Sequence, residues 1–274
     1  MSRHDRLGRS RARSAPPWSL GIPAALALIF LLLPLTALVL RAPWAAMPRL
    51  LSEPTVRDAL RLSLFTASLA TVVATVLGVP LAWVLARIEF PGRSLARALV
   101  ILPLVLPPVV GGVALLLALG RRGVVGGLLY DWTGWSLPFS TAGVVVAETF
   151  VAMPFLVVTV EGALRGFDQR YEEAGAMLGA GRLTVLRRVT LPMLAPSLAA
   201  GAVLCFARAL GEFGATITFA GNAPGRTQTM PLAVYLALED DPDAAIALSL
   251  VLLVVCVGVL LLLRERWLRR DLLG

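Results

Sequence analysis

Six long apolar stretches constrain the fold of this chain more than any other feature of its sequence. Each has the length of a helix that crosses the hydrocarbon core of a bilayer, which takes about 20 residues. Lipid offers the backbone no hydrogen-bond partners, so a helix, which satisfies its own backbone, is the expected conformation. We therefore predict an all-α membrane protein with six transmembrane helices, at residues 19–40, 61–86, 98–120, 141–164, 194–220 and 244–263.

The first stretch follows a basic segment, residues 1–18, and so has the general layout of a secretory signal. Its apolar run is too long for a signal sequence, and no clear small-residue cleavage site follows it. We predict an uncleaved first span, with residues 19–56 forming one transmembrane helix and an outer loop. Residues 265–274 follow the last span as a short C-terminal segment.

The distribution of arginine predicts how the spans are oriented. The termini and loops on one side of the six spans hold 17 arginines, and the loops on the other side hold 7. Arginine is enriched on the cytoplasmic side of membrane proteins. Both termini and the loop at residues 165–193 are therefore predicted to be cytoplasmic, in a multi-pass protein of the plasma (inner) membrane.

Residue types that support catalysis are scarce in this chain. It has 25 arginines and no lysine, which excludes a P-loop and a lysine Schiff base. The single histidine, His4, lies in the basic tail, and Cys205 and Cys256 lie in apolar stretches, so neither a metal site nor a disulfide is indicated. The net charge of +8 comes from arginines that flank the spans, which indicates contact with lipid rather than with nucleic acid. We expect no catalytic residue, metal or cofactor here.

A polar island interrupts the apolar pattern at residues 168–192, with the sequence DQRYEEAGAMLGAGRLTVLRRVTLP. Asp168 is placed to cap a helix whose first turns carry Glu172 and Glu173, where carboxylates favour the positive end of the helix dipole. Two glycines then break the helical pattern before a second apolar stripe, which ends at Pro192. The prediction is a short helix, a turn and a second short helix.

The polar island resembles the EAA loop of importer-type ABC transporter permeases. The family pattern is EAA, three residues, glycine, nine residues and then I-x-L-P, and the chain departs from it at Gly175 and Val189. In that family the loop is a coupling element that seats in a cleft of the cytoplasmic ATPase subunit. The resemblance implies an ATPase-coupling role for Glu172, Glu173, Ala174, Gly175, Leu178, Gly179, Leu191 and Pro192. An amphipathic hairpin on the membrane surface is the alternative.

The third span contains consecutive prolines, Pro107 and Pro108, in the run LPLVLPPVVGG. Proline in a spanning helix frees backbone groups, which have to be satisfied by neighbouring helices or by a water-lined cavity. This helix is therefore predicted to be broken or kinked. The pattern fits a kink alone as well as a helix that lines a translocation pathway.

The fifth span contains two ionisable residues, Arg208 and Glu212, four positions apart and so able to pair across one helical turn. Buried charges in a span are costly and usually face the bundle interior or an aqueous path. Gly211 and Gly214 bracket the carboxylate and allow close approach of another helix. Two interpretations stay open: an element of the translocation pathway or gate, and a structural ion pair that fixes helix packing.

The family resemblance covers residues 57–264. The run RALGEFGATITFAGN followed by TQTMPLAVY is similar to the sulfate and molybdate branch, and is closer to the molybdate permeases. It implies import of molybdate, or tungstate, by alternating access in a homodimer, with two cytoplasmic ABC ATPase subunits that bind ATP and Mg and with an extracytoplasmic oxyanion-binding protein. The alternative is a sulfate or thiosulfate permease. A secondary transporter is less supported, because no inverted repeat is visible and Glu148, Glu161 and Glu212 are too dispersed for a relay.

Overall fold

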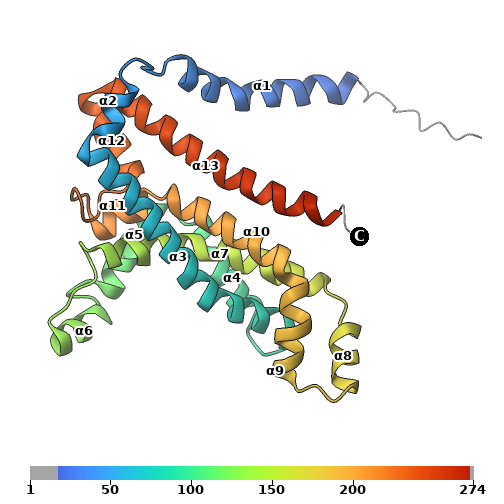
Figure 1. The fold of residues 1–274 in the computed structure, drawn as a ribbon. Coiled ribbons are helices and arrows are strands. Elements are labelled where there is room, and N and C mark those ends of the chain that lie inside the picture. Colours follow the sequence, from blue (N-terminus) through green and yellow to red (C-terminus); the bar gives the residue numbers. More distant parts are fainter. Residues whose placement is uncertain (1–17, 272–274) are drawn as a thin grey trace, which may run out of the picture. The chain divides into compact units, whose positions relative to one another are not determined.

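All regular elements in the described part of the chain are helical, as predicted (Figure 1). A computed structural model describes residues 18–271, so the basic tail predicted at residues 1–18 lies almost entirely outside the described residues, as do residues 272–274. The elements are α1 (Trp18–Leu40), α2 (Met47–Ser52), α3 (Pro54–Arg87), α4 (Arg93–Val105), α5 (Pro108–Leu119), α6 (Gly126–Thr133), α7 (Thr141–Gly166), α8 (Arg170–Met177), α9 (Arg182–Val185), the π-helix η1 (Leu186–Thr190), α10 (Leu191–Leu210), α11 (Gly214–Ala220), α12 (Met230–Asp240) and α13 (Pro242–Asp271).

The described helices include five candidate membrane spans, or six when the bent pair α4 and α5 counts as one. The prediction of six spans agrees with the second count. The predicted fifth span, residues 194–220, is wrong at both ends. Its helix runs from Arg182 to Leu210, and α11 is a separate short helix.

The chain divides into two compact units, with the boundary between Ala42 and Pro43. The described part of the first unit is mainly α1, and none of the apolar window within Leu20–Leu40 is buried inside the protein. A long apolar helix that is not buried within the protein is stable when lipid surrounds it. This agrees with the prediction of a first transmembrane helix.

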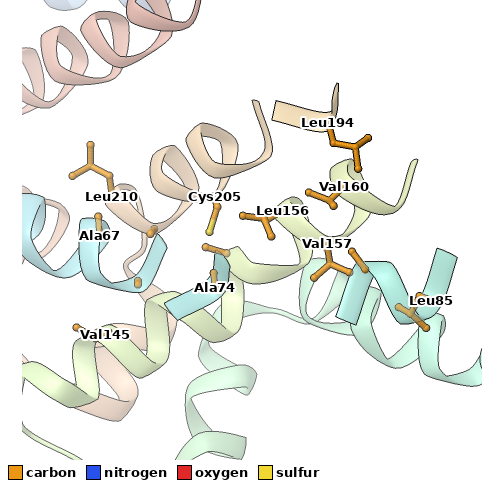
Figure 2. Close-up of a cluster of buried hydrophobic side chains, with 14 of the residues drawn as sticks. Ala67, Ala74, Leu85, Val145, Leu156, Val157, Val160, Leu194, Cys205 and Leu210 are labelled. Atoms are coloured by element: carbon orange, nitrogen blue, oxygen red, sulfur yellow. The ribbon is translucent and has the colours of Figure 1, made fainter. Parts of the chain in front are cut away.

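The core of the second unit lies where α3, α7 and α10 pack along one another. Ala67 and Ala74 of α3 are fully buried, and their small side chains let the neighbouring helices approach closely. Leu156 of α7 and Cys205 of α10 occupy the space between the three helices (Figure 2). Within this unit, α8 and α9 lie at one end of the bundle, and α6 and α12 lie at the other (Figure 1).

Three shorter helices, α2, α6 and α12, occur where the sequence pattern predicted only loops. The segment α12 packs against α13 and α3, and the backbone N–H of Met230 at its start donates to the hydroxyl of Ser63, at 2.7 Å. Contacts with two longer helices thus stabilise a helix that is too short to be recognised from its own periodicity.

Candidate functional site

The polar island folds as the predicted helix and turn. The carboxylate of Asp168 accepts a hydrogen bond from the backbone N–H of Arg170, the first residue of α8, at 3.0 Å, so Asp168 caps the helix from one position before its N-cap residue, Gln169. At the other end, Gly179 has a φ of +79°. Its N–H donates to the carbonyl of Ala176, and the N–H of Ala180 donates to that of Gly175. This is the Schellman arrangement, in which a left-handed residue closes a helix.

The second half of the island differs from the prediction of a short helix that ends at Leu191 and Pro192. The elements α9, η1 and α10 form one helical run, Arg182–Leu210, and this run is a candidate membrane span. In the π-helical turn, the N–H of Leu191 bonds to the carbonyl of Leu186, five residues earlier. Such a local adjustment satisfies the backbone around a proline, so Pro192 lies inside the run without ending it.

The hairpin formed by α8 and α9 exposes an apolar surface. No residue of α8 is buried, and the side chain of Leu178 at the turn is 89% exposed. Tyr171, Met177 and Leu183 are also exposed, and so are Glu173 and Ala174 of the EAA-like motif. Exposed apolar side chains gathered at the tip of a polar hairpin are typical of a surface that binds another protein.

The inner face of the same hairpin is partly enclosed and mostly apolar, with Glu172 and Glu173 among its polar residues. A cavity of about 760 Å³ lies between the end of α3 and the hairpin. Glu172 faces it and pairs with Arg87 of α3, while Gly175 packs so closely on Val185 that a β-carbon there would lie 3.1 Å from Cγ2 of the valine. This contact explains why glycine occupies the position at which the family pattern has alanine.

The predicted break in the third span is confirmed. The helices α4 and α5 meet at an angle of 118° around Pro107, which has an extended backbone. The start of α5 packs against α11 so tightly that a β-carbon on Gly214 would lie 2.9 Å from Cβ of Pro108. Further along, a β-carbon on Gly112 would lie 2.6 Å from Cβ of Thr218. The fold thus brings Pro108 of the broken third span into contact with Gly214, which follows the ion pair of the predicted fifth span.

The predicted pair of Arg208 and Glu212 is also confirmed. Nη1 of the arginine lies 2.6 Å from Oε2 of the glutamate, and their side chains are 27% and 1% exposed. The second oxygen of Glu212 accepts a hydrogen bond from the backbone N–H of Ala215 at 2.8 Å, so the carboxylate caps α11 as well. Because this side chain competes with continued helix, α10 ends at Leu210, and the turn at Gly211 separates it from α11.

A third carboxylate, Glu148 of α7, was not among the predicted site residues. It is buried, and its Oε1 accepts a hydrogen bond from the hydroxyl of Thr66 at 2.9 Å, whereas Oε2 has no hydrogen-bond partner among the described residues. The signal in the sequence that could have identified Glu148 as a site residue was an acidic side chain in the middle of an apolar span.

Glu161, at the other end of α7, belongs to a different group. Its carboxylate binds Arg97 at 2.6 Å and Arg165 at 2.7 Å. Glu161 is therefore paired with arginines, whereas Glu148 accepts a hydrogen bond from a threonine. Among the described side chains, no three His, Cys, Asp or Glu residues lie close enough to share a metal ion.

Residues 75–272 match the family described as "Binding-protein-dependent transport system inner membrane component". The chain is 50% identical to the "Molybdenum transport system permease protein ModB" of Mycobacterium tuberculosis over 90% of its own length and 92% of the relative. It is 43% identical to the protein of the same name from Escherichia coli K12, over 78% and 93%. The "Sulfate transport system permease protein CysT" of Salmonella typhimurium is 38% identical, over 86% of both chains.

Two kinds of solved structure share the fold. A chain of a bacterial ABC transporter involved in the import of the acidic polysaccharide alginate superposes with a TM-score of 0.74 at 17% identity, and covers 92% of this chain and 94% of its own. A chain of the MetNI methionine ABC transporter superposes with a TM-score of 0.58 at 18% identity, over 80% and 98%. At these identities the similarity shows that the fold is that of an ABC importer permease.

Proposed function

Because this chain belongs to the family of binding-protein-dependent transport system inner membrane components, we propose that it is the membrane-spanning subunit of an ATP-driven importer that carries molybdate into the cytoplasm. The relatives named for molybdenum transport share more identity with it than the relative named for sulfate transport. This difference favours molybdate, with tungstate as a second cargo, over sulfate or thiosulfate.

The observation that carries the proposal is the exposed hairpin of α8 and α9. Its apolar tip, centred on Leu178, and the exposed Glu173 together offer a surface that fits a cleft in a separate ATPase subunit. In this arrangement two copies of the chain bind two ATPase subunits, which hold ATP and Mg, and closure of the ATPase pair moves the hairpins. The chain supplies the pathway and the transmission, and it does not catalyse hydrolysis.

The ion pair of Arg208 and Glu212, together with the contact between Pro108 and Gly214, is proposed to form part of the gate. While the pair is closed, the carboxylate neutralises the arginine and weakens its attraction for an anion. A movement of α5 against α11 would shift the turn that carries Glu212 and free the arginine. An external binding protein delivers the anion to the outward-open state, and the two permeases then alternate between outward-open and inward-open states.

The substrate is tested by reconstituting the permease with its own ATPase and binding protein. Molybdate, tungstate and sulfate are all tetrahedral dianions, so selection among them by size belongs to the closed pocket of the binding protein. We expect molybdate at micromolar concentration to stimulate ATP hydrolysis and uptake, and sulfate to have little effect. Stimulation by sulfate without stimulation by molybdate would reject the substrate and leave the importer class intact.

The orientation in the membrane is tested with reporter fusions. The arginine distribution supports an orientation with the hairpin and both termini in the cytoplasm. A fusion after Arg182 is expected to report the cytoplasm, and a fusion after Arg226 is expected to report the outside. The reverse result would contradict the proposed coupling, because the hairpin would then face away from any cytoplasmic ATPase.

A further inference from the structure

We infer that Glu172 is a positioning residue, which clamps the coupling hairpin to the end of α3 and so passes the movement of the hairpin to the broken span formed by α4 and α5. The inference rests on the proposed coupling function of the hairpin. It assigns separate roles to two consecutive carboxylates: Glu172 is half-buried and contacts Thr190 and Arg87, whereas Glu173 is exposed.

Glu172 contacts residues outside α8, and these residues are buried or half-buried. Its Oε1 accepts a hydrogen bond from the hydroxyl of Thr190 at 2.8 Å and lies 3.4 Å from Nη2 of Arg87. The arginine side chain is only 10% exposed, and its guanidinium lies 5.8 Å from the ring centroid of Phe167. One carboxylate therefore joins α8 to the last turn of α3 and to the residue that precedes α10.

The last turn of α3 also holds α4. Arg93 donates from Nε to the carbonyl of Leu85 at 2.8 Å and from Nη2 to that of Ala86 at 3.0 Å. Arg97 donates to the same carbonyl of Leu85 at 2.8 Å and to Glu161 of α7. These bonds satisfy carbonyl groups that the end of a helix leaves unpaired, and arginine suits the negative end of its dipole.

A continuous set of contacts thus connects the hairpin with the gate. The hairpin contacts the end of α3 through Glu172, the end of α3 contacts α4 through two arginines, and α4 ends at the break beside Pro107. Beyond the break, Pro108 packs on Gly214, next to Glu212. Packed helices and ion pairs of this kind can carry energetic coupling between distant sites, and Glu172 is the connection to test.

The main experiment uses the permease reconstituted with its ATPase and its molybdate-loaded binding protein. Glu172→Gln keeps the shape of the side chain and removes its charge. We expect this variant to retain the ATPase in a pull-down, and the stimulation of ATP hydrolysis by the loaded binding protein to fall about tenfold, within the range of ordinary coupling energies. Thr190→Val, which removes one buried hydroxyl donor, is expected to lower stimulation about threefold, as the loss of one hydrogen bond does.

Two further variants separate the possible outcomes. Glu173→Ala, which removes the exposed carboxylate of α8, is expected to release the ATPase from the complex, whereas Glu89→Gln removes an exposed carboxylate outside the hairpin and is expected to behave as wild type. If Glu172→Gln releases the ATPase as Glu173→Ala does, Glu172 is an ATPase contact, and the inference is wrong while the coupling function stands. If all four variants keep the ATPase and normal stimulation, the coupling function of the hairpin fails as well.

A double-mutant cycle tests the pair of Glu172 and Arg87 directly. It compares several variants, so its result does not depend on whether one of them folds. Stimulation is measured for Glu172→Gln, Arg87→Gln and both together, each at equal amounts in the membrane. If the two residues act as one clamp, the double change lowers stimulation no further than either single change. Independent, multiplying losses would overturn the inference.

Discussion

Arg208→Ala alone is expected to damage the protein more than the double change of Arg208→Ala with Glu212→Ala. The single change leaves a carboxylate that is 1% exposed with only the N–H of Ala215 to stabilise it. Breaking a buried ion pair from one side costs about 3–5 kcal/mol. The double change removes the buried charge and adds only the loss of a helix cap, which costs about 1 kcal/mol.

The measurement is the free energy of unfolding in detergent, with uptake of molybdate in vesicles as the functional readout. Arg122→Ala is the control, because this arginine is exposed and lies outside the spans. If the losses of unfolding free energy for Arg208→Ala and Glu212→Ala instead simply add in the double variant, the ion pair contributes little to stability. Arg208 would then remain a candidate contact for the anion itself.

The features of the fold that follow from local chemistry were predictable from the sequence. The break at Pro107 follows from a missing backbone donor, the cap by Asp168 follows from the preference of carboxylates for helix starts, and the apolar stretches follow from the thickness of the bilayer. Each of these depends on residues within a few positions of one another. The prediction of six spans therefore agrees with the count in which α4 and α5 form one bent span, and the first helix and turn of the polar island lie where they were predicted.

The predictions that failed depend on interactions that hydropathy does not record. The apolar run through residues 194–220 suggested one helix, but Glu212 bonds to the backbone of Ala215 and starts a new one. The run into Pro192 suggested a helix end, but a π-helical turn carries the helix past the proline. In both cases one hydrogen bond decides between continued helix and a break, at an energy too small to appear in a window average.

Glu148 and the half-buried position of Glu172 show a different limit. The partner of Glu148, Thr66, lies 82 residues away in the sequence, and the partner of Glu172, Arg87, lies 85 residues away. A single sequence contains no signal for such pairs, since only packing of α3 against α7 and of the hairpin against α3 creates them. Glu172 and Glu173 consequently received one role from the family pattern, although Glu172 is half-buried beside Arg87 and Glu173 is exposed.

Gly179→Val is expected to abolish retention of the ATPase while the permease still reaches the membrane. The φ of +79° at this position is left-handed, and a β-branched residue there is strained by at least about 1–2 kcal/mol. The strain opens the Schellman turn and displaces Leu178, the most exposed apolar side chain at the tip of the hairpin. A pull-down of the ATPase with the purified permease measures the loss.

Two other variants show which property of Gly179 matters. Gly181→Val is the matched control, because Gly181 has a φ of −65° and no atom lies within 4 Å of a β-carbon built there. Gly179→Asn preserves the left-handed turn, since asparagine tolerates this conformation. A β-carbon on Gly179 also meets nothing within 4 Å inside the chain. If Gly179→Asn binds the ATPase, the turn conformation is what the complex requires. If it does not, the ATPase approaches the glycine itself.

Normal retention of the ATPase and normal transport by Gly179→Val would contradict both explanations. The hairpin would then not be the coupling element.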